Sequence, residues 1–145
     1  MMSTSEPLPG HDQTRRLYRA WTTKFRNAFR GVARGVREQN SFRVHFSFAL
    51  AVLVAGAAFQ ISLLEWCVLL MCITAVLAAE LFNSALEFMA KAITDQHNLH
   101  LGLALDIGSA AVLVAAIGSA IVGSIIFLMR LGVALGWWPL PAVFS

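Results

Sequence analysis

Three long apolar stretches occupy most of the chain after residue 43. They run from about residue 44 to 63, from 66 to 90 and from 101 to 129. A helix of about 20 apolar residues crosses a hydrocarbon core of about 30 Å, because each residue adds about 1.5 Å. The pattern therefore predicts three membrane-spanning helices, joined by a short link near residues 62–65 and by a polar loop over residues 91–100.

A different pattern precedes the first apolar stretch. Over residues 15–38 apolar side chains recur at helical spacing (Trp21, Phe25, Phe29, Val32 and Val36), and the opposite side carries Arg26, Arg30, Arg34 and Arg37. Aromatic residues on one face and arginines on the other are typical of a helix that lies in the membrane interface. A helix packed on a soluble partner is the alternative.

The two ends of the chain carry neither pattern. Residues 1–14 are polar and contain two prolines, so we expect a disordered tail there. We place the end of the third span at Arg130 and expect residues 130–145 to form a short apolar tail, whose two tryptophans suit the membrane interface.

The charges support a membrane protein with a defined orientation. Only 13% of the residues are charged, about half the usual share. Nine of the 11 Lys and Arg lie in residues 15–43. A basic arm also suits nucleic acid, but the apolar remainder favours a lipid surface, so we expect no nucleic-acid partner. The positive-inside rule places the N-terminus and the loop 91–100 in the cytoplasm.

Polar residues interrupt the second span at regular intervals. Glu80, Asn83, Ser84 and Glu87 have i, i+3, i+4 and i+7 spacing, which places them on one face near the cytoplasmic end. Ionisable groups inside a membrane are rare and usually belong to a functional site. A single carboxylate would be explained by an interhelical hydrogen bond, but two carboxylates and an amide on one face favour function.

The third span offers a partner for this face in Asp106, which also lies near its cytoplasmic end. A carboxylate cluster provides the oxygen ligands that suit Mg²⁺ bound to nucleotide phosphates. A carboxylate can also act as general base towards an alcohol. These features together predict phosphoryl transfer to a lipid hydroxyl. A proton relay or channel is the remaining alternative, and it does not explain the basic amphipathic helix.

Several motifs resemble one known family. The chain contains four motifs similar to those of the small prokaryotic diacylglycerol kinases and the related undecaprenol kinases. They are FRVH at residues 42–45, ELFNSALE at 80–87 with its preceding Ala79, ITDQH at 93–97 and DIGSAAV at 106–112. The resemblance covers roughly residues 21–129. It implies an all-α integral membrane protein of the bacterial inner membrane, a homotrimer of three-span protomers. The active sites would lie between protomers at the cytoplasmic face, with Mg²⁺ and ATP.

The resemblance also implies roles for individual residues. Glu80 resembles the general base for the lipid hydroxyl, and Glu87 resembles a magnesium ligand, with Glu38 as a second candidate. Nucleotide binding or organisation of the site is implied for Asn83, Ser84, Asp106 and Lys91. Substrate binding is implied for Arg43 and Ser109.

Three positions depart from the family pattern. Leu105 stands where members usually have a lysine that contacts phosphates, Lys91 replaces an aspartate, and Gln39 replaces a glutamate that binds metal. Lys91 either substitutes for the missing cation or simply pairs with Glu87 or reaches the headgroups. The alternative function is therefore a catalytically impaired relative that acts in lipid binding or assembly. We assign His45 to the headgroup boundary rather than to catalysis.

Overall fold

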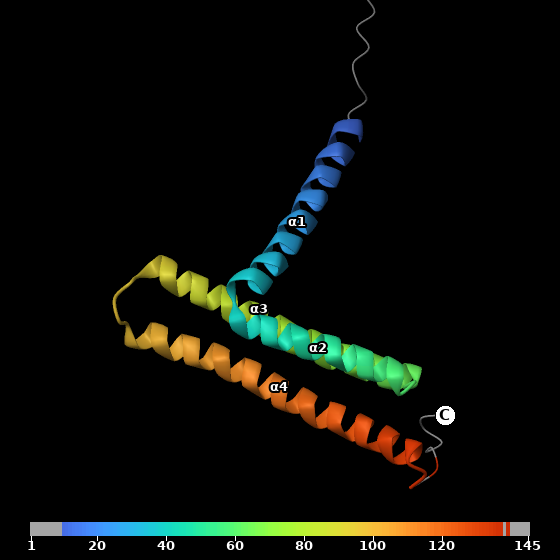
Figure 1. Ribbon diagram of the computed structural model, residues 1–145. Coiled ribbons are helices and arrows are strands. Elements are labelled where there is room, and N and C mark those ends of the chain that lie inside the picture. Colours follow the sequence, from blue (N-terminus) through green and yellow to red (C-terminus); the bar gives the residue numbers. More distant parts are fainter. Residues whose placement is uncertain (1–9, 138, 140–145) are drawn as a thin grey trace, which may run out of the picture. The chain divides into compact units, whose positions relative to one another are not determined.

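The computed structural model describes residues 10–137 and 139, with side chains from residue 19 onward. This part of the chain consists of four helices (Figure 1): α1 (Gly10–Glu38), α2 (Asn40–Ala58), α3 (Leu63–Ile93) and α4 (Leu99–Ala134). Three of them, α2 to α4, are long and apolar enough to cross a membrane. The predicted all-α fold with three membrane-spanning helices is therefore confirmed.

The helix α1 begins earlier than the sequence pattern suggested. It starts at Gly10, so residues 10–14 belong to the helix and not to the tail, while residues 1–9 lie outside the described part. The reason is that Pro9 is the last proline before residue 139, and nothing after it interrupts helical hydrogen bonding. Its aromatic residues are exposed on one face, where the Lys24 ammonium lies 5.2 Å from the Trp21 ring centroid.

The chain divides into two compact units, residues 1–34 and 35–145. In the second unit α3 packs mainly against α4, and α2 packs against α3 (Figure 1). A small core of Ile61, Leu69 and Ile126 lies between these helices. Many large apolar side chains face outward, among them Phe82 and Val114, which are more than 70% exposed. Helices that are apolar on all sides suit a surrounding of lipid.

The turn between α2 and α3 is tight. The N–H of Ile61 donates to the carbonyl of Gly56, and the N–H of Gln60 donates to that of Ala57, which ends α2 in a Schellman motif. Gln60 takes the left-handed conformation (φ 49°) that glycine usually occupies in this motif. A Cβ added at Gly56 would lie 2.9 Å from the Trp66 ring, so only glycine permits this close contact between the two helices.

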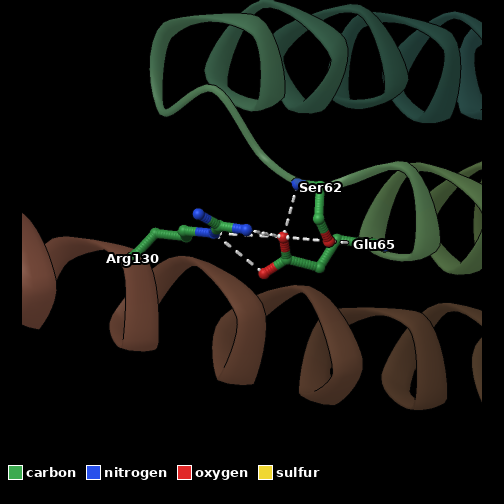
Figure 2. Close-up of polar contacts among 3 residues, drawn as sticks. All are labelled: Ser62, Glu65 and Arg130. Atoms are coloured by element: carbon green, nitrogen blue, oxygen red, sulfur yellow. Dashed lines mark hydrogen bonds and ion pairs between the residues drawn. The ribbon is translucent and has the colours of Figure 1, made fainter. Parts of the chain in front are cut away.

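A buried ion pair joins the beginning of α3 to the end of α4 (Figure 2). The Ser62 N–H and hydroxyl donate to Glu65 Oε2 at 2.7 and 2.8 Å, and Ser62 caps the helix by accepting from the Glu65 N–H. Arg130 Nε donates to both Glu65 oxygens at 3.0 Å. Glu65 is only 2% exposed, so it is a buried partner and not simply part of a surface link.

The helix that contains this arginine extends past the expected end of the third span. We placed that end at Arg130, but α4 continues to Ala134 and ends in a second Schellman motif with Gly136 at φ 71°. The helix can continue through the arginine because Glu65 neutralises its charge. Of the expected tail, residues 138 and 140–145 lie outside the described part.

Candidate active site

The polar face of α3 is the centre of the site. Glu80, Asn83 and Ser84 are buried, with 2%, 7% and 4% of their surface exposed, and Glu87 is half-buried one turn further on. The i, i+3, i+4, i+7 spacing therefore does place the four residues on the packed side of the helix. Burial of two carboxylates is costly unless each receives hydrogen bonds.

The beginning of α2 supplies the donor for the first carboxylate. The Ser41 hydroxyl donates a hydrogen bond to Glu80 Oε1. Ser41 itself is exposed, whereas its neighbour Phe42 is 2% exposed and anchors this turn of α2. A surface hydroxyl on an anchored turn thus reaches a carboxylate that is almost completely buried.

The second carboxylate is held by two neutral amides. Gln39 Nε2 donates to Glu87 Oε2 at 2.9 Å, and Asn83 Nδ2 donates to Glu87 Oε1 at 3.3 Å. Gln39 is the N-cap residue of α2, so its side chain leaves the helix end in the direction of α3. The position where the family resemblance expects a carboxylate therefore carries a hydrogen-bond donor to Glu87.

The helix α4 closes the site through a glycine. A Cβ at Gly108 would lie 2.6 Å from Asn83 Oδ1 and 3.0 Å from Leu86, so the backbone of α4 approaches α3 closely at this point. Asn83 Oδ1 is buried without a hydrogen-bond partner among the described atoms. An unsatisfied buried acceptor of this kind indicates a place for a donor or a cation.

A small polar cavity lies between the three helices beside Glu80. Its volume is about 250 Å³, and its polar lining consists of Ser41, His45, Glu80, Asn83 and Ser109. A larger apolar cavity of about 770 Å³ extends along α2, α3 and α4 towards Phe59 and Leu131. The two cavities share His45 and Ala116 as lining residues, so the polar cavity lies beside the apolar one.

The remaining predicted site residues lie outside this cavity, apart from Ser109. Asp106, Arg43, Glu38 and Lys91 are exposed. The Lys91 ammonium lies 5.7 Å from the centroid of the Phe88 ring, while Glu87 accepts from the two amides. Within residues 10–137, no group of three His, Cys, Asp or Glu side chains is close enough to hold a metal ion, so Asp106 does not join Glu80 and Glu87 in a single chain.

The donor set nevertheless fits a divalent cation that also binds phosphates. Glu87 offers carboxylate oxygens, and Asn83 offers a buried amide oxygen that lacks a partner. Mg²⁺ usually takes one or two protein carboxylates and completes its coordination with water and substrate phosphates. The two residues are compatible with that arrangement.

Comparison with known proteins agrees with this site. Residues 26–127 match the sequence model of a family described as prokaryotic diacylglycerol kinase. The chain belongs to the prokaryotic diacylglycerol kinase family. It is 36% identical over 107 residues to the undecaprenol kinase of Bacillus subtilis (strain 168), which covers 74% of this chain and 87% of that relative. It is 33% identical over 105 residues to the diacylglycerol kinase of Synechocystis sp., covering 72% of this chain and 60% of that relative.

Membership confirms the predicted lipid kinase and the predicted multi-pass membrane protein. Sequence reasoning missed two residues of the cavity, Ser41 and His45. They lie one turn apart on α2, so they share a face. The sequence did contain a signal for this pair, because two polar residues with i, i+4 spacing stand at the start of an apolar span. We had assigned His45 to the headgroup boundary, but its side chain lines both cavities.

Proposed function

We propose that this lipid kinase transfers the γ-phosphoryl group of ATP to the hydroxyl of a membrane alcohol, with diacylglycerol and undecaprenol as the candidate substrates. The observation that carries the proposal is the buried Glu80 carboxylate in a polar cavity that lies beside a larger apolar one. A lipid alcohol has the matching form, with one polar group at the end of a hydrocarbon.

In this proposal Glu80 is the general base. The O–H bond of the alcohol breaks, its proton passes to Glu80, and the oxygen forms a bond to the γ-phosphorus while the bond to ADP breaks. The cavity would hold the hydroxyl within hydrogen-bonding reach of the carboxylate, which general-base catalysis requires. Ser109 lines the same cavity and is the candidate contact for the substrate, with Arg43 as a second candidate nearer the surface.

Glu87 and Asn83 are the candidate residues for Mg²⁺, and Glu38 is a further candidate. When bound, Mg²⁺ supplies positive charge that stabilises the phosphates during transfer. Ser84 would support this face of α3 from its buried position, since it is 4% exposed. Asp106 and Lys91 are exposed and would act on the nucleotide from the rim of the site.

We also propose a homotrimer in the bacterial inner membrane with the N-terminus in the cytoplasm. The exposed Asp106 supports an assembly in which one copy completes the site of another, because it does not line the cavity of its own chain. The orientation is supported by the nine Lys and Arg in residues 15–43.

The test is ATP-dependent phosphorylation of lipids by the purified protein in mixed micelles with Mg²⁺. We expect Glu80→Gln to lower kcat by roughly 100- to 10,000-fold, because the alcohol loses its base. Thr74→Val is the matched control on the same helix, since the Thr74 hydroxyl donates only to the Leu70 carbonyl of its own helix at 2.8 Å and is exposed. The proposal is lost if neither lipid is phosphorylated faster by the wild type than by Glu80→Gln.

A further inference from the structure

Ser41 is an unusual surface serine because its hydroxyl donates to the candidate base. The Glu80 carboxylate is 2% exposed and accepts this hydrogen bond at Oε1. The last side-chain torsion of glutamate is broad, so a carboxylate without a fixed donor has a poorly defined orientation. The hydroxyl of Ser41 removes that freedom.

The turn that carries Ser41 is itself fixed on both sides. Gln39, two residues before, donates to Glu87 at 2.9 Å, and its carbonyl accepts the first helical hydrogen bond of α2 from the Arg43 N–H at 3.3 Å. Phe42, the next residue, is 2% exposed, and its ring lies 3.7 Å from the place that a Cβ at Gly35 would occupy. The hydroxyl is therefore presented by a segment that one hydrogen bond ties to α3 and that a buried aromatic ring anchors.

The same serine also lines the polar cavity in which the alcohol would lie. We propose that Ser41 is a positioning residue of the reaction: its hydrogen bond fixes the orientation of the Glu80 carboxylate for removal of the proton from the lipid hydroxyl. The inference rests on the proposed function, because it takes Glu80 as the base. Ser41 keeps its own proton throughout and does not react.

The first experiment compares kcat and KM of Ser41→Ala and Ser47→Ala for ATP and lipid in mixed micelles. Ser47 is the matched control, because it lies on the same helix, is exposed, and donates to the Arg43 carbonyl of that helix at 2.9 Å. A hydrogen bond to a charged group contributes a factor of roughly 10 to 100, so we expect Ser41→Ala to lower kcat by that factor. Both KM values should stay within about twofold of the wild type, and Ser47→Ala should match the wild type in all three constants.

Two further measurements separate positioning from a merely structural role. Ser41→Thr keeps the hydroxyl and should recover most of the lost kcat, which a merely structural role of the serine in stability would not require. In a double-mutant cycle Ser41→Ala should cause no further loss in a Glu80→Gln background, because a residue that acts through the base has nothing left to position.

The outcomes distinguish the two levels of the proposal. If Glu80→Gln keeps wild-type activity, the base is wrong and the inference falls with it. If Glu80→Gln is inactive while Ser41→Ala behaves like Ser47→Ala, the proposed function stands and the role of Ser41 is refuted. A full additional loss in the double variant, or no recovery with threonine, would also refute it.

Discussion

Glu87 accepts hydrogen bonds from two amide groups. One of them belongs to Gln39, at the position where the family resemblance expects a second carboxylate. Gln39 and Asn83 each donate to one of its oxygens. Neutral donors satisfy the half-buried Glu87 carboxylate without adding another charge, so there is no repulsion between carboxylates at this contact. Glutamine in place of glutamate at position 39 also removes one negative ligand from the candidate metal site. The residue at position 39 therefore decides between less charge repulsion around Glu87 and one more carboxylate for a candidate cation.

The variant Gln39→Glu should shift this balance. A second carboxylate beside Glu87 adds negative charge to the candidate site, so we expect half-maximal activity at a Mg²⁺ concentration lower by about tenfold. Asn40→Asp is the control, since it makes the same change in net charge one position further along, at an exposed residue. The measurement is activity against Mg²⁺ concentration. Equal curves for both variants would mean that position 39 does not contribute to the metal site.

At the scale of the elements, the turn between α2 and α3 contains a backbone cost that a substitution can remove. Gln60 lies at φ 49°, where a side chain costs about 1 kcal/mol relative to glycine. We expect Gln60→Gly to raise the free energy of unfolding by about that amount. Gln96→Gly in the loop before α4 is the matched control, because Gln96 does not have a positive φ. Among the described residues other than glycine, only Gln60 does. Chemical unfolding in detergent measures both, and equal effects would contradict the prediction.

The ion pair between α3 and α4 gives a second prediction at this scale. Breaking a buried pair by removing one partner costs about 3 to 5 kcal/mol, so we expect Glu65→Gln to lower the stability by a value in that range. Its effect on KM for ATP should be negligible, since Glu65 lies 15 residues, or about 22 Å along α3, from Glu80.

Thermal unfolding of Glu65→Gln beside Thr74→Val tests this, because both changes remove a side-chain hydrogen bond from α3. A double replacement, Glu65→Leu with Arg130→Leu, should recover much of the loss, since neither charge is left unpaired. A Glu65→Gln variant as stable as Thr74→Val would contradict the prediction.

The elements also show what the sequence could and could not reveal. The three spans, the interfacial pattern of α1 and the stripe from Glu80 to Glu87 follow from periodicities of the chain itself. The contacts of Ser41 and Gln39 do not, because they depend on how the start of α2 lies against a stripe about 40 to 50 residues later. The extension of α4 past Arg130 was missed for the same reason, since its partner Glu65 is 65 residues away.

At the scale of the whole molecule, the exposed Asp106 leads to a test of the proposed trimer. In a shared site, Glu80 of one copy works with Asp106 of another, so mixing Glu80→Gln and Asp106→Asn chains restores some intact pairs. Random mixing in equal amounts restores roughly a quarter of the sites in a closed ring. The measurement is lipid kinase activity after co-expression, compared with each variant alone.

The control for this mixture is Glu80→Gln with Glu80→Ala, which cannot restore a site by any exchange of partners. Activity no higher than in this control would mean that Asp106 does not complete the site of another copy.

The pairing of Glu65 with Arg130 also has a consequence for biogenesis. In the proposed orientation the C-terminal end of α4 is the last part to cross the membrane. It takes the Arg130 guanidinium to the outer side, although the positive-inside rule favours positive charge in the cytoplasm. By then α3 is already in place, and Glu65, which Ser62 holds in its capping box, can receive the arginine. A chain without this glutamate would have to translocate the arginine without this carboxylate beside it. The first sign of its loss would then be a fraction of molecules whose last helix fails to insert, before any change in catalysis.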